Sequence, residues 1–171
     1  MLRATPPTLL LALLVAGCTA PPPPPAKTPP PPPAPPVAPI GPAAELEWRD
    51  MPLAAGTWTY AAEATGSVAR FGPQGQPPAL LVRCDHAART VALVRPGAGA
   101  GAMTVTTSYS GRDWRAEAGA EGAVAHLPAS DPFLDRMAFS RGRFSVAVAG
   151  VSLLMVPAWA EPARVIEDCR R

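Results

Sequence analysis

Apolar and polar positions alternate along the chain after residue 44, and this two-residue period predicts short β-strands. In residues 57–60 the rings of Trp58 and Tyr60 share one face. In residues 80–84 Leu80, Val82 and Cys84 share one face, while Arg83 points away. The same alternation marks Val91 and Leu93; Met103 and Val105; Val124 and His126; Phe144, Val146 and Val148; and Val151, Leu153 and Met155.

Turn residues separate these segments. Residues 72–75 and the glycine-rich residues 97–101 interrupt the pattern, and Gly150 lies where a hairpin can turn between Phe144 and Met155. Residues 97–101 lack the lysine and hydroxyl of a phosphate-binding loop, so we interpret them as a flexible connection. The pattern predicts a mostly β fold, an antiparallel β-sandwich or open barrel with two short helices.

The first helix is predicted to begin after Asp131. The carboxylate of Asp131 can cap the first turn, and Pro132 suits the first helical position. An apolar stripe follows, and we expect Gly142 to end the helix. The stripe consists of Phe133, Leu134, Met137 and Ala138.

The second helix is predicted to begin at Pro162. Val165, Ile166 and Cys169 fall at positions i, i+1 and i+4, which places Cys169 on the buried face.

The N-terminus has the pattern of a lipoprotein signal peptide. Arg3 precedes an apolar run over residues 9–16, and Val15, Ala16 and Gly17 lead to Cys18. The run is much shorter than the roughly 20 residues of a membrane-spanning helix. We expect residues 1–17 to be removed and Cys18 to be lipidated, whereas an ordinary signal peptide is the alternative. Thr19, which is not acidic, favours the outer over the inner membrane by resemblance to proteobacterial lipoproteins.

Residues 18–43 form the next predicted segment, the lipidated cysteine and a proline-rich stalk. Thirteen prolines lie in residues 21–39, and proline fixes φ and removes a donor. An extended polyproline II segment of this length reaches roughly 60 Å. We interpret it as a spacer, although proline-rich segments can also be ligands. Residues 44–171 then form a single β-rich domain.

The three cysteines divide into one lipidated residue and one pair. If Cys18 carries lipid, Cys84 and Cys169 remain in an oxidising compartment, and both periodicities point them into the core. We therefore expect a disulfide that pins the C-terminal helix. Closing a loop of about 86 residues stabilises a fold by about 4 to 5 kcal/mol in the chain-entropy model.

The predicted domain has no net charge. Its thirteen arginines balance thirteen carboxylates, which excludes an electrostatic footprint for nucleic acid. The expected partners are the membrane, through the acyl chains, and an envelope protein or a cell-wall component.

The layout resembles the periplasmic β-sandwich proteins related to invasion-associated locus B. The likeness covers a strand ending in Cys84 and Asp85, the helical segment 131–135, a strand-turn-strand and a terminal helix with Cys169. The second half also resembles uncharacterised alphaproteobacterial lipoproteins of sphingomonad type. That likeness rests on residues 137–144, Pro157, Trp159, Glu161, Arg164 and residues 168–170. The resemblance implies a periplasmic fold and carries over no catalytic residue.

Candidate catalytic groups are few. His86 and His126 are the two histidines, and Cys84 with His86 could begin a zinc site, but no second pair of ligands follows. We interpret His86 as a surface turn residue and expect no metal and no cofactor. Asp131 and Asp135 could form a glycosidase-like pair, but capping and pairing of Asp135 with Arg136 or Arg141 explain them more simply.

The strongest candidate site is the pair Arg141 and Arg143, which flank Gly142. Forked guanidinium donors bind carboxylate or phosphate. The alternative is a helix-ending turn, since arginine near a helix C-terminus is favourable. In the anion-site interpretation the two arginines should be dispensable for stability. Trp48, Trp58, Trp114 and Trp159 could form a carbohydrate platform, but their spread favours core and rim positions.

These observations predict a non-enzymatic envelope lipoprotein that faces the periplasm and has a binding or structural role. An enzyme that acts on cell-wall or carbohydrate material through carboxylates is the alternative.

Overall fold

The computed structural model describes residues 48–171. They form nine strands and two helices. The elements are β1 (Thr57–Glu63), β2 (Gly66–Gly72), β3 (Leu80–Asp85), β4 (Thr90–Arg95), β5 (Gly101–Thr106), β6 (Gly111–Gly119), β7 (Gly122–Pro128), α1 (Pro132–Ala138), β8 (Arg143–Val148), β9 (Leu154–Pro157) and α2 (Ala160–Arg170).

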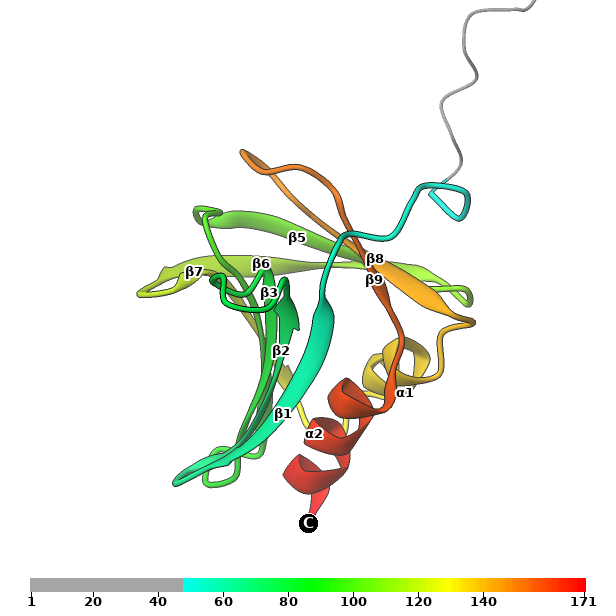
Figure 1. Ribbon diagram of the computed structural model, residues 1–171. Helices are drawn as coiled ribbons and strands as arrows, with labels where there is room; N and C mark the ends of the chain where they lie inside the picture. The colour runs from blue at the N-terminus through cyan, green and yellow to red at the C-terminus, as the bar shows by residue number, and fades with distance from the viewer. Residues whose placement is uncertain (1–47) are drawn as a thin grey trace, which may run out of the picture. The chain divides into compact units, whose positions relative to one another are not determined.

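All strand pairs are antiparallel, and the sheet order is β1-β2-β3-β4-β7-β6-β5-β8-β9. The long strand β6 joins two halves, because Gly111 to Ala116 pair with β5 while Glu117 to Gly119 pair with β7. In Figure 1, β1 to β3 form one curved wall, β5 and β8 run across above it, and both helices lie in the angle between them. This folded sheet confirms the predicted mostly β class.

The two ends of the sheet meet. The indole Nε1 of Trp58 on β1 donates to the carbonyl of Pro157 on β9 at 2.8 Å, and the amide of Ala54 donates to the carbonyl of Met155 at 2.8 Å. Trp58 also packs against Phe71 and Phe144, with ring centroids 5.3 and 6.5 Å away. An apolar core thus fills the space between the two halves of the sheet.

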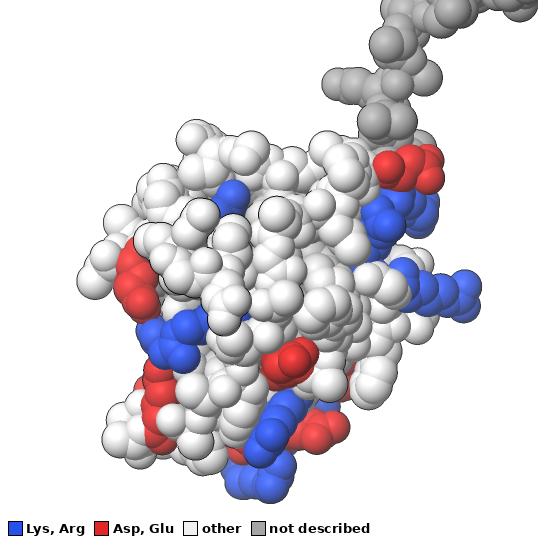
Figure 2. Space-filling model, in the orientation of Figure 1, with Lys and Arg blue, Asp and Glu red and all other residues white. Residues whose placement is uncertain are grey.

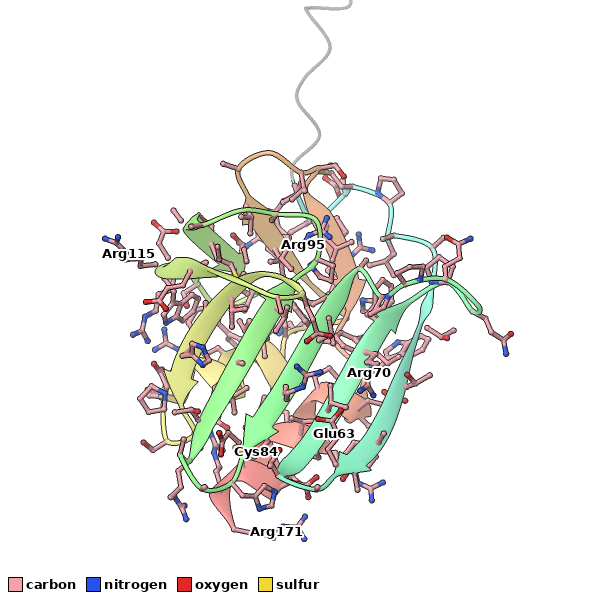
Figure 3. The ribbon with its side chains drawn as sticks, turned by 90° about the vertical axis from the view of Figure 1, so that its left-hand side faces the viewer. Glu63, Arg70, Cys84, Arg95, Arg115 and Arg171 are labelled. Carbon is pink, nitrogen blue, oxygen red and sulfur yellow. A yellow bond between two sulfur atoms is a disulfide. The ribbon has the colours of Figure 1, made fainter. Side chains whose placement is uncertain are left out.

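A smaller apolar cluster lies on the other side of the first wall. Val68, Leu81 and Val94 are fully buried there. Ion pairs run beside this cluster: Glu63 contacts Arg70 at 2.6 Å and Arg83 at 3.3 Å. Glu63 and Arg70 lie next to each other on the face shown in Figure 3. The wall is therefore apolar on both faces, which explains why β2 shows no simple alternation.

Helix α1 begins as predicted and ends earlier. The Asp131 carboxylate accepts from the amide of Phe133 at 2.9 Å, and Pro132 is the first helical residue. Phe139 caps the C-terminus, so the prediction that Gly142 ends the helix was wrong. Gly142 instead has φ +78° in the turn that leads into β8. That conformation favours glycine.

Helix α2 begins two residues before the predicted Pro162. Val165, Ile166 and Cys169 are buried, and Cys169 forms the predicted disulfide with Cys84, with a Cα–Cα distance of 5.4 Å. The helix is thereby joined covalently to β3. Among residues 48–171, no helix is long and apolar enough to cross a membrane.

The β8–β9 hairpin turns at Gly150, as predicted, but β9 begins only at Leu154. The prediction that Val151 and Leu153 belong to this strand was wrong. The loop between β8 and β9 is instead fixed by a side chain from β4. The guanidinium of the buried Arg95 donates to the carbonyls of Ala79 and Ser152 at 2.8 and 3.2 Å. Burial lowers the pKa of Arg95.

Candidate functional site

Arg141 and Arg143 line a surface hollow of about 400 Å³ together with Trp48, Arg49 and Ser108. We call these five residues the arginine hollow. They come from three places in the chain: the start of the described residues, the turn between β5 and β6, and the segment that runs from the turn after α1 into the start of β8. Figure 2 shows blue side chains, with red ones directly beside them, on the upper right of the domain, on the side where the described chain begins.

Two serines fix the turns that carry the hollow. The hydroxyl of Ser140 accepts from the amide of Ser108 at 2.9 Å, and the hydroxyl of Ser108 accepts from the amide of Arg141 at 2.8 Å. The Ser140 hydroxyl also donates to the carbonyl of Arg143. These reciprocal bonds hold the β5–β6 turn against the loop before β8, so the hollow has a defined backbone.

The three arginines of the hollow differ in their contacts. Arg143 is half-buried, and its guanidinium donates to the carbonyl of Met51 at 2.6 Å. The Arg49 guanidinium lies 5.0 Å from the centre of the Trp48 ring. The Arg141 side chain is exposed, and no ion pair to it is found within the described chain. Arg141 is therefore placed to offer a forked pair of donors to a carboxylate or phosphate.

Three exposed aromatic residues are chain neighbours of residues that form or bond to the turns of the hollow. The exposed fractions are 53% for Tyr109, 64% for Phe139 and 46% for Trp159. Tyr109 follows Ser108, and Phe139 precedes the Ser140 that binds Ser108. Trp159 follows Ala158, whose amide donates to the carbonyl of Gly142 at 3.3 Å.

We call these three residues the aromatic rim. Large apolar side chains are seldom exposed together unless they contact a partner, so the hollow and the rim form one candidate binding surface.

The carboxylates Asp131 and Asp135 are engaged in other contacts. Asp131 accepts from Arg112 at 2.9 Å as well as capping α1. Asp135 accepts from Arg170 of α2 at 2.7 Å. The prediction that Asp135 pairs with Arg136 or Arg141 was therefore wrong, because the sequence does not reveal that α2 packs beside α1. Arg136 instead donates to the hydroxyl of Ser110 at 3.0 Å.

The considered zinc pair is not available for metal binding. Cys84 is consumed in the disulfide, while His86 and His126 are exposed on a turn and on β7. No group of three or more metal-ligating side chains occurs among residues 48–171.

The four tryptophans occupy different environments. Trp58 lies in the core, and Trp114 packs edge-on against Phe133 with ring centroids 4.8 Å apart. Trp48 and Trp159 belong to the hollow and the rim. The predicted split into core and rim aromatics is therefore seen. Cys18 and the proline-rich residues 21–39 lie outside the described residues.

Sequence reasoning found Arg141 and Arg143 but missed their neighbours. Trp48, Arg49 and Ser108 are distant along the chain, and only the folded sheet brings them together. Exposed aromatic residues beside turn serines were the available signal. Comparison with protein families, with curated proteins and with solved structures finds no match to this chain.

Proposed function

We propose that the protein is a membrane-anchored envelope lipoprotein whose β domain is a non-enzymatic binding module. In this proposal Cys18 carries the lipid, residues 21–39 act as the spacer, and the domain faces the periplasm, with the outer membrane as the anchoring membrane. The observation that carries the binding role is the arginine hollow, together with the exposed aromatic residues that neighbour its turns in the chain.

The distribution of polar groups supports binding over catalysis. The buried polar residues of the described chain are Ser67, Arg95, Thr107, Ser140 and Ser145. A glycosidase-like enzyme would need two carboxylates facing each other across a cleft. Asp131 and Asp135, the pair considered for that role, are instead bound to arginines on separate elements.

Photocrosslinking in cells tests the binding role. A photoreactive residue at Tyr109 should give one defined adduct, whereas the same residue at Arg115 should give none. Arg115 is a suitable control because it lies on β6 and points away from the domain in Figure 3. Equal labelling from both positions, or no adduct from either, would contradict a binding surface at the hollow.

A further inference from the structure

We infer that the arginine hollow and the aromatic rim bind a glycan strand that bears carboxylates, of the kind found in the cell wall. The inference deepens the proposed function, because it names the chemical class of the partner for the same surface. It rests on two features connected through the same turns: arginines that line a hollow, and exposed aromatic residues that neighbour those turns in the chain.

The hollow selects for an anionic group. Arg141 and Arg143 both line the hollow; Arg141 is exposed, whereas one guanidinium nitrogen of Arg143 is bonded to the carbonyl of Met51. The described residues carry nearly balanced charges overall, and the salt bridges elsewhere neutralise several of the other arginines. The hollow gathers arginine side chains at one place, which suits single carboxylates spaced along a polymer better than a uniformly charged surface.

The rim selects for flat, partly apolar faces. Tyr109 and Phe139 are the chain neighbours of Ser108 and Ser140, which are bonded to each other, and Trp159 follows Ala158, which is bonded to Gly142. Aromatic side chains pack against the apolar faces of sugar rings, while the hydroxyl groups of the sugars stay in water. Because the aromatic residues neighbour the turns that carry the arginines, a strand in which sugars alternate with acidic substituents would offer a partner to both kinds of side chain.

The length of the preceding chain agrees with a partner away from the membrane. The described chain begins at Trp48, which itself lines the hollow. An extended segment of about twenty residues reaches roughly 60 Å. A spacer of this length lets the surface contact a polymer that is not part of the bilayer.

Co-sedimentation with isolated cell-wall sacculi tests the inference. The mature chain with Cys18→Ser is used, so that acyl chains do not contribute to pelleting. It should pellet with untreated sacculi. Its affinity for sacculi whose carboxylates have been amidated should be at least about tenfold lower. R141A should lose at least about tenfold in affinity, and so should the triple variant Y109S/F139S/W159S.

R115A and L153A are the matched controls. R115A removes an exposed arginine and L153A removes an exposed apolar side chain, and neither residue belongs to the arginine hollow or the aromatic rim. Both should bind as the parent chain does. Equal binding to untreated and amidated sacculi, or full binding by R141A, would overturn the inference.

A second arm uses vesicles of equal parts phosphatidylglycerol and phosphatidylcholine. Binding to these vesicles that depends on Arg141, without binding to sacculi, would overturn the glycan inference and leave the proposed binding function standing. The crosslinking experiment at Tyr109 tests that function separately.

Discussion

At the scale of single residues, Asp168 shows how α2 is held on the first wall of the sheet. Its carboxylate accepts from the hydroxyl of Tyr60 at 2.7 Å, and the Arg164 guanidinium lies 4.0 Å from the centre of the Tyr60 ring. Burial opposes the charged carboxylate, but the hydrogen bond from Tyr60 and the charges of Arg171 and Arg164 favour it. The net result is a lowered pKa for Asp168.

The first prediction concerns Tyr60→Phe and its dependence on pH. A carboxylate with a lowered folded-state pKa stabilises the fold above its unfolded pKa, and this contribution is lost as the pH falls through the folded pKa. Y60F should therefore lower the free energy of unfolding by about 1 to 2 kcal/mol at pH 7. The difference from the parent should shrink in acid, below about pH 4. Urea denaturation at several pH values measures it, and a difference independent of pH would show that Asp168 is not the partner that matters.

The second prediction separates Arg143 from Arg141. Because Arg143 donates to the carbonyl of Met51, we expect Arg143 to contribute to stability, whereas Arg141 should be dispensable. R143A should lower the free energy of unfolding by about 1 to 2 kcal/mol, since a charged hydrogen bond is lost. R141A should change it by less than about 0.5 kcal/mol, as is usual for exposed positions.

Thermal and urea unfolding of the two variants give the comparison. R143K is the control for charge, because lysine keeps the positive charge and a single donor but not the planar fork. If R141A lowers the free energy of unfolding as much as R143A does, the prediction is wrong and the Arg141 side chain contributes to stability.

At the scale of elements, most strands and both helices could be predicted because each carries an apolar stripe with a regular period. Cys84 and Cys169 each lie on an apolar stripe with its proper period, so their pairing could be predicted. β2 was missed because Val68 on one face and Ala69 and Phe71 on the other are all buried, which removes the alternation. β6 was missed for the opposite reason, since seven of its nine residues are exposed.

The candidate site was predictable only in part. Arg141 and Arg143 could be found because they flank a glycine within three residues. The hollow itself depends on Ser108, which reaches Arg141 only because β5 pairs with both β6 and β8. Register between distant strands is set by tertiary packing, so a local pattern does not reveal it.

The third prediction concerns the disulfide as the attachment of α2. The double variant C84A/C169A should lower the free energy of unfolding by about 2 to 5 kcal/mol, because the loop of 85 residues is no longer closed in the unfolded chain. Amide hydrogens of α2 should also exchange faster, since a short helix without its cross-link opens more readily. Urea denaturation and hydrogen exchange measure the two effects.

Reduction of the parent protein is the control for that variant. Reductant should lower the stability of the parent toward that of C84A/C169A and leave the variant unchanged. Labelling of both thiols shows that the bridge has been reduced. If the denaturation midpoint of the parent protein is then unchanged, the bridge does not stabilise the fold.

At the scale of the whole molecule, the proposed function requires the described domain to be attached through the residues that precede it. The domain holds its own core, disulfide and candidate surface within residues 48–171. The proposed spacer has thirteen prolines in residues 21–39, which disfavours both helix and ladder hydrogen bonds. Anchoring and binding are therefore expected to be separable properties of different segments.

The fourth prediction is that the mature protein begins at an acylated Cys18. Val15, Ala16 and Gly17 after the apolar run predict cleavage before the cysteine and lipid on its thiol and amine. Two or more acyl chains give stable membrane attachment, whereas one chain gives only reversible binding. Mass spectrometry of the N-terminal peptide should find the lipid, and the protein should fractionate with membranes. Cys18→Ser should move it to the soluble periplasmic fraction with the Cys84–Cys169 bridge intact. A parent protein that is already soluble, with a free Cys18 thiol, would contradict the lipid anchor while leaving the β domain and its binding surface as described.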